Sequence, residues 1–241
     1  MAGHSKWNNI KRKKEKTDSQ RAKIFTKIGR EISVAVREGG ADPANNGKLR
    51  DVIAKAKSAN VPSDNIERLI KKASGGDKTD YETITYEGYG PGGVAVIAEA
   101  LTDNRNRTAA DVRHYFDKYG GNLGTTGCVS FMFTPKGVIV IDMSGLEEDA
   151  VLDDSVESGA DDISFDDGIA EILTAPAQLR TVREELEKKG YSFVSADLEY
   201  IPSNYVKLEG EENLKKMAIL IDLLEDNDDI QNIWHNLEND V

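Results

Sequence analysis

The chain has 241 residues, 39% of them hydrophobic and 31% charged, with a formal net charge of −12. This length and composition fit two or three packed domains better than one. No segment approaches the roughly 18 consecutive apolar residues of a membrane helix, and the only cysteine, Cys128, excludes an intramolecular disulfide and a cysteine metal cluster. We therefore expect a cytoplasmic protein without a membrane partner.

Charge is distributed very unevenly along the chain. Residues 1–80 hold 19 Lys or Arg and 10 Asp or Glu, a net charge of +9, whereas residues 81–241 hold 12 and 33, a net charge of −21. Residues 1–37 alone carry 11 Lys or Arg against three acidic residues, a net charge of +8. An asymmetry of this size is typical of a basic region that faces nucleic acid.

The N-terminal part of the sequence predicts a basic arm followed by three helices. Residues 1–17 contain too few apolar groups to order themselves alone. A first helix is predicted to begin near Asp18 or Ser19, because both are good N-caps and apolar residues then recur every three or four positions. It ends at the glycine pair 39–40, and two shorter amphipathic helices follow, the third beginning at Pro62.

The remaining sequence alternates between strand and helix patterns. The predicted elements are strands at 81–86 and 94–101, a helix at 108–119, strands at 128–133 and 138–141, a helix at 147–158, strands at 162–165 and 169–174, a helix at 176–189, strands at 193–200 and near 205–208, a helix at 211–224 and a strand at 230–237.

These elements predict an α+β multidomain fold, with an N-terminal three-helix bundle followed by two α/β domains. The second half of the pattern has the order βαββαβ, which is the ferredoxin-like arrangement. The simplest packing places the C-terminal strands and helix against the strands that begin at residue 81. The predicted domains are therefore a basic helical domain at 1–79, a discontinuous α/β domain at 80–134 plus 206–241, and an inserted ferredoxin-like domain at 135–205.

Motifs for catalysis or metal binding do not fit the chain. Lys48 follows a glycine as in a phosphate-binding loop, but Asp42 and Leu49 stand where that motif needs glycine and a hydroxyl residue. The acidic run 153–167 lacks the ligand spacing of a calcium loop, and the three histidines are far apart. We predict no catalytic site, no metal site, no cofactor and no small-molecule substrate.

The basic region predicts a nucleic-acid-binding surface made of the arm and the first helix. Its Lys and Arg side chains would contact phosphates, and Trp7 offers a flat ring that could stack on a base. The alternative is a solvated lysine-rich tail. The predicted binding residues are His4, Ser5, Lys6, Trp7, Lys11, Arg12, Lys13, Lys14, Lys16, Arg21, Lys23, Lys27 and Arg30.

A second polar cluster, residues 102–108, joins a predicted strand to a predicted helix. Its Arg105 and Arg107 stand at the helix start, where positive charge opposes the helix dipole. This placement predicts an anionic partner, inside or outside the chain. The alternative is a simple capping loop, with Asn106 or Thr108 as the N-cap.

Several long motifs resemble the YebC/PmpR family, which includes the mitochondrial translational activator of cytochrome oxidase. The motifs are MAGHSKWNNIKRKK at 1–14, REI at 30–32 ahead of GGADP at 39–43, NVPSDNI at 60–66, YEGYGP at 86–91 and LTDNRNRT at 101–108. The resemblance covers essentially the full chain, although Cys128 stands where the family pattern has serine. It implies three domains, one of them discontinuous, in a cytoplasmic bacterial protein without a catalytic site.

The resemblance implies two alternative functions that use the same basic region. Some family members are similar to DNA-binding transcriptional regulators, which is our leading hypothesis. Others are similar to ribosome-associated factors that relieve stalling at proline-rich stretches through ribosomal RNA or tRNA contacts. A third hypothesis is a protein-interaction scaffold that binds no nucleic acid. The sequence contains no readable helix-turn-helix with base-reading residues. This weakens the case for sequence-specific DNA recognition and strengthens the ribosomal alternative, although DNA binding stays the leading hypothesis.

Overall fold

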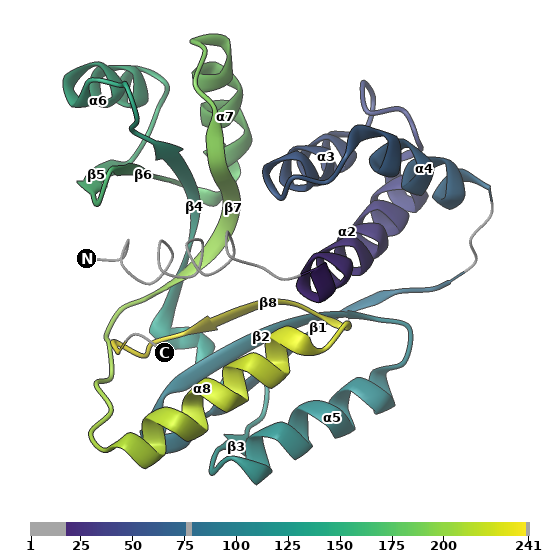
Figure 1. The fold of residues 1–241 in the computed structure, drawn as a ribbon, viewed down its shortest axis with the longest axis vertical. Helices are drawn as coiled ribbons and strands as arrows, with labels where there is room; N and C mark the ends of the chain where they lie inside the picture. Colours follow the sequence, from purple (N-terminus) through teal and green to yellow (C-terminus); the bar gives the residue numbers. More distant parts are fainter. Residues whose placement is uncertain (1–17, 76–78, 240–241) are drawn as a thin grey trace.

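The computed structural model describes residues 18–75 and 79–239, with side chains from residue 22 onward. In this part of the chain, three N-terminal helices precede two four-stranded antiparallel sheets, which confirms the predicted fold class (Figure 1). The predicted arm at 1–17 lies outside the described residues. None of the described helices is long and apolar enough to cross a membrane.

Helices α2 (Asp18–Gly39), α3 (Gly47–Ser58) and α4 (Ser63–Ser74) form the N-terminal bundle. Their apolar faces meet in one cluster, as the three- and four-residue spacing predicts. The buried members of this bundle core are Ile28, Ile32, Ala35, Val36, Leu49, Val52, Ala56, Val61 and Ile66.

Asn46 connects α2 to α3. Its side-chain oxygen accepts a hydrogen bond from the Leu49 amide at 3.0 Å, which caps α3, and its amide nitrogen donates to the carbonyls of Ala35 at 2.7 Å and Gly40 at 2.8 Å. Glycine is required at position 39, because a Cβ atom there would lie 2.7 Å from the Asn46 side chain.

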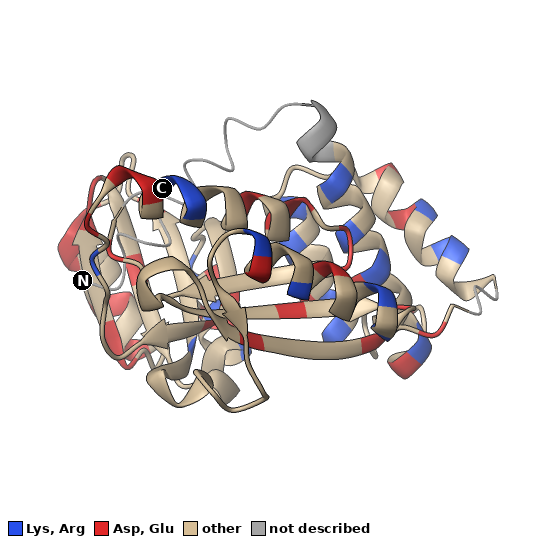
Figure 2. Cartoon of the chain, turned by 90° about the horizontal axis from the view of Figure 1, so that it is seen from below, with Lys and Arg blue, Asp and Glu red and all other residues tan. Residues whose placement is uncertain are grey.

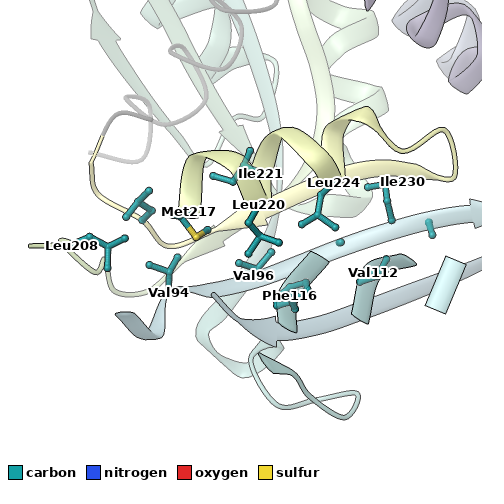
Figure 3. Packing of buried hydrophobic residues seen from close by; sticks show 13 residues of the cluster. Val94, Val96, Val112, Phe116, Leu208, Met217, Leu220, Ile221, Leu224 and Ile230 are labelled. Carbon is teal, nitrogen blue, oxygen red and sulfur yellow. The ribbon is translucent and has the colours of Figure 1, made fainter. Parts of the chain in front are cut away.

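The first sheet contains β1 (Glu82–Tyr89), β2 (Ala95–Thr102), β3 (Asn122–Leu123) and β8 (Ile230–His235), in the order β3-β1-β2-β8. Helices α5 (Arg105–Lys118) and α8 (Glu211–Asp226) cover one face of this sheet (Figure 1). Figure 3 shows that Leu220 and Leu224 of α8 point toward Phe116 and Val112 of α5, with which they share one buried apolar cluster. Strand β8 pairs with β2 in this sheet, although the two strands are far apart in the sequence.

The second sheet contains β4 (Phe133–Asp142), β5 (Asp162–Asp166), β6 (Ile169–Thr174) and β7 (Phe193–Pro202), in the order β5-β6-β4-β7. Helices α6 (Glu148–Glu157) and α7 (Leu179–Lys188) pack on one face through Val151, Val182 and Leu186. This is the predicted ferredoxin-like order. The exact domain boundaries stay a prediction.

An apolar cluster joins the two sheets. Its buried residues are Ala95, Ile97, Val129, Phe133 and Trp234. The indole of Trp234 meets the ring of Tyr200 edge to face, with centroids 4.8 Å apart, and its nitrogen donates to Glu199 at 2.7 Å. This inter-sheet cluster fixes the second sheet on the first.

The predicted strand at 128–133 is wrong. Residues Ser130–Met132 form a 3-10 turn, and a strand begins only at Phe133. The cause is the buried carboxylate of Glu87, which accepts hydrogen bonds from the amides of Gly127, Val129 and Ser130 at 2.8 to 3.0 Å. These amides are therefore unavailable to a strand partner. Burial alone would raise the pKa of Glu87, but the three amide hydrogen bonds lower it, so the group stays charged.

Two smaller predictions also need correction. The predicted strand near 205–208 is reduced to an isolated parallel bridge between Val206 and Leu237. Helix α5 begins at Arg105 rather than 108, because the side chain of Asn104 accepts a hydrogen bond from the Arg107 amide at 3.1 Å. Asn104 is therefore the N-cap that the sequence reading assigned to position 106 or 108.

Candidate nucleic-acid interface

The predicted binding residues divide into a group outside the described chain and a group on α2. The arm residues lie outside the described residues, and so does the side chain of Arg21. Lys23, Lys27 and Arg30 follow one another at intervals of four and three, so they share one side of the helix. The structure places all three against the turn between α8 and β8, which Figure 1 shows beside the N-terminal part of α2.

This turn, residues 225–229, contains four acidic residues and is called the acidic turn below. Lys23 Nζ lies 2.7 Å from Asp226 Oδ1. Lys27 Nζ donates to the backbone carbonyl of Glu225 at 2.8 Å. The side chains of Lys23 and Asp226 remain 34% and 60% exposed, so this outer part of the contact is open to solvent.

Arg30 makes the inner part of the same contact. Its guanidinium pairs with the carboxylate of Asp229, donates to the carbonyl of Leu101 at 3.0 Å and lies 5.6 Å from the centre of the Tyr81 ring. The side chains of Arg30 and Asp229 are only 15% and 4% exposed. Arg30 is therefore held inside the molecule in this arrangement.

Asp229 connects α2 with α5. Besides Arg30, its carboxylate accepts hydrogen bonds from Arg107 Nη2 and Thr108 Oγ1, both at 2.7 Å, and from Thr102 Oγ1 at 3.2 Å. Burial alone would raise the pKa of Asp229, but the hydrogen bonds from Thr108, Arg107 and Arg30 outweigh it and lower the pKa to about 2. Asp229 is thus a buried carboxylate that stays charged, and its oxygen atoms accept several hydrogen bonds.

In the second predicted cluster, Arg107 has anionic partners inside the chain. Arg107 pairs with Asp229 and also with Asp103, at 2.8 Å. Hydrogen bonds to these two carboxylates raise the pKa of Arg107. Arg105 is exposed at the start of α5, and an external anion for it stays a prediction.

A second ionic contact attaches the bundle to the ferredoxin-like sheet. Asp51 of α3 lies 2.5 Å from Arg180 Nη2 and 3.0 Å from Arg183 Nη1, both on α7. Sequence reasoning missed Asp51 and the acidic turn. One signal was available for the turn: acidic residues at the C-terminal end of α8 oppose the helix dipole and so require nearby cations.

Further cations lie on the outer side of the bundle, and the sequence reading did not single them out. Lys57 of α3 and Lys71 and Lys72 of α4 are exposed. Figure 2 shows Lys and Arg concentrated on the bundle helices at the right, and Asp and Glu prominent at the opposite end of the molecule. The bundle can therefore present positive charge to a polyanion without using Arg30.

Known protein families and relatives match almost the whole chain. Residues 5–76 match the TACO1/YebC protein N-terminal domain, and residues 81–237 match the TACO1/YebC second and third domain. A relative from Finegoldia magna is 59% identical and covers 100% of both chains, and one from Acetivibrio thermocellus is 59% identical over 98% of both. Each is named a probable transcriptional regulatory protein.

A solved structure gives the same result for the fold. The crystal structure of a conserved hypothetical protein from Aquifex aeolicus is similar, with a TM-score of 0.82, 45% sequence identity and 92% of each chain covered.

Proposed function

Because this chain belongs to the TACO1/YebC family, we propose that it is a cytoplasmic, non-enzymatic regulator of gene expression that binds nucleic acid through its basic N-terminal region. The leading target is DNA. The observation that carries the proposal is the net charge of +9 on residues 1–80 of a chain whose remainder carries −21. The names of the relatives support a regulatory role.

The binding surface would combine three groups of cations. The arm supplies the largest group, residues 6–16, together with His4, Ser5 and the ring of Trp7. Lys23 and Lys27 form the edge of α2, and Lys57, Lys71 and Lys72 extend the surface over the bundle. Arg30 would position α2 through its buried pair with Asp229 rather than contact phosphate.

Binding would be driven by phosphate contacts and would depend steeply on salt. The acidic remainder of the chain would repel the phosphate backbone of the nucleic acid. This repulsion would orient the basic region toward the nucleic acid and limit contacts of the other domains with it. Lysine meets phosphate as a point charge, and a phosphate contact carries no sequence information.

A second candidate target is ribosomal RNA. The observation that favours it is that the sequence contains no readable helix-turn-helix with base-reading residues, whereas the exposed Lys57, Lys71 and Lys72 suit recognition of a phosphate backbone. The same surface would then serve a ribosome-associated factor, with the contacts to RNA replacing those to DNA.

The test compares DNA and ribosomes with one charge variant. The variant replaces Lys11, Arg12, Lys13 and Lys14 by alanine. A matched control replaces four lysines outside the basic region, Lys118, Lys188, Lys215 and Lys216, with the same change in net charge.

A DNA regulator should select particular fragments from a genomic pool and bind them at least about 1,000-fold more tightly than random duplex at about 150 mM salt. A ribosomal factor should instead sediment with ribosomes. In both cases the arm variant should lose binding and the control should keep it. If the wild type binds neither target, the nucleic-acid proposal fails and the scaffold hypothesis leads.

A further inference from the structure

Lys23, Lys27 and Arg30 of α2 have internal partners, although the proposed function needs some of them for phosphate. We infer that the acidic turn at 225–229 is an intramolecular competitor of the nucleic acid, which covers Lys23 and Lys27 in the free protein and is displaced when a polyanion binds. This inference rests on the proposed function and adds a regulation of the same surface.

The acidic turn is well suited to bind the cations of α2. Helix α8 ends at Asp226 with no basic residue in its last turn, so its carboxylates add to the negative end of its own dipole. Lys27 contacts a terminal carbonyl of α8, and Lys23 contacts the carboxylate of Asp226. Oxygen atoms that carry full or partial negative charge thus contact the two lysines that a phosphate group would also need.

The contact has a fixed inner layer and a labile outer layer. Asp229 is buried, Arg30 is largely covered, and each has further partners of its own, so breaking their pair disturbs a buried charge. Lys23 and Asp226 are partly exposed, and a pair of this kind changes an equilibrium constant by at most about fivefold. A polyanion that makes several phosphate contacts can therefore displace the outer layer while the inner layer holds.

The attachment of the bundle includes partly exposed ion pairs, which makes such competition possible. The bundle core contains only residues 24–73, and none of the apolar clusters among the described residues combines the bundle with either sheet. The contacts that link the bundle to the rest include the pairs of Lys23, Arg30 and Asp51 with side chains of the sheet domains. Phosphate competes directly for Lys23, the basic member of the partly exposed pair, and not for Arg30.

The test measures affinity for a fluorescein-labelled 20-base-pair duplex of mixed sequence, as DNA and as RNA, by anisotropy with the full chain. Asp226→Asn should bind about threefold more tightly than wild type. Asp228→Asn is the matched control, because it removes the same charge from the same turn, is exposed, and forms no ion pair with described residues. The control should change affinity by less than about 1.5-fold.

Two further readouts distinguish competition from general electrostatics. Asp226→Asn should make the salt dependence of DNA affinity steeper by about one phosphate contact, a change in slope of about 0.9. Adding Lys23→Ala to Asp226→Asn should remove the gain in affinity, because the lysine that the first substitution releases is then absent.

The inference is overturned if Asp226→Asn leaves affinity unchanged, or if both turn variants tighten binding equally while the wild type still binds. If no form of the protein binds either duplex, the inference is rejected, and the proposed function fails with it only if the wild type also does not sediment with ribosomes. The wild-type titration and the wild-type sedimentation together distinguish the two failures.

Discussion

At the scale of single residues, Asp229 has the largest structural consequence. It brings a negative charge into a site that is nearly closed to water, where an unpaired carboxylate would be strongly destabilising. Arg30, Arg107 and Thr108 compensate this charge from two different helices. One side chain therefore determines how α2 and α5 are placed relative to each other.

Asp229→Asn should lower the free energy of unfolding by about 3 kcal/mol at pH 7, because the neutral amide leaves two guanidinium groups without their shared carboxylate. For a chain of this size the melting temperature should fall by about 6–12 °C. Urea unfolding followed by circular dichroism measures the difference. Asp228→Asn should stay within about 0.5 kcal/mol of wild type.

The stability difference between wild type and Asp229→Asn should depend on pH. The folded-state pKa of Asp229 is lowered from 3.8 to about 2, so its stabilising contribution is complete above about pH 4 and is lost as pH falls through 2. The stability difference between wild type and Asp229→Asn should therefore narrow between pH 4 and pH 2. A difference that stays constant over this range would show that the carboxylate charge is not responsible.

At the scale of elements, the connection between α2 and α3 depends on one side chain. Asn46 caps α3 and also closes the end of α2, and glycine at 39 leaves the space for it. Periodicity alone predicts the apolar faces of the bundle core, whereas these three hydrogen bonds connect the end of α2 to the start of α3.

Asn46→Ala should cost about 2–3 kcal/mol, because it removes the cap of α3 and two hydrogen bonds to buried or partly buried carbonyls. Asn46→Asp keeps the cap acceptor and loses both donors, so an intermediate cost is expected. Asn45→Ala, in the exposed turn next to it, serves as the control. Equal stability of Asn46→Ala and Asn45→Ala in chemical unfolding would contradict this account.

At the scale of the whole molecule, two kinds of contact hold the parts together. The sheets share the apolar inter-sheet cluster, whereas the contacts of the bundle with the rest of the molecule include several ion pairs. Apolar burial is insensitive to phosphate and only weakly affected by moderate salt, but partly exposed ion pairs are screened. The two sheets therefore form a stable body, and the bundle is the part whose attachment responds to ionic conditions.

Trp234→Ala should separate the unfolding of the two sheets, since it removes the largest ring of the inter-sheet cluster, at a cost of about 3–5 kcal/mol. Calorimetry should then resolve an additional transition. Trp234→Phe keeps an aromatic ring but loses the hydrogen bond to Glu199, so it should retain the wild-type number of transitions with a lower midpoint. An unchanged profile for Trp234→Ala would show that the sheets unfold together for another reason.

The elements were largely predictable because apolar spacing reports which side of a helix or strand is buried, and this is local information. The bundle helices and the βαββαβ order follow from it. The error at 128–133 arose because the carboxylate of Glu87, some 40 positions earlier, captures the amides that a strand would need. No spacing within the segment could reveal that partner.

The sequence by itself determined the charge separation, the helices and most strands, the fold class and the family resemblance, since each depends on composition or short-range pattern. Only the tertiary structure decided which charges meet. Arg30 and Asp229 are 199 positions apart, and Lys23 reaches Asp226 across a similar gap. Their pairing exists because β8 lies beside β2 and carries the acidic turn against α2. The basic face predicted for nucleic acid therefore has an internal partner, which a linear count of charges does not contain.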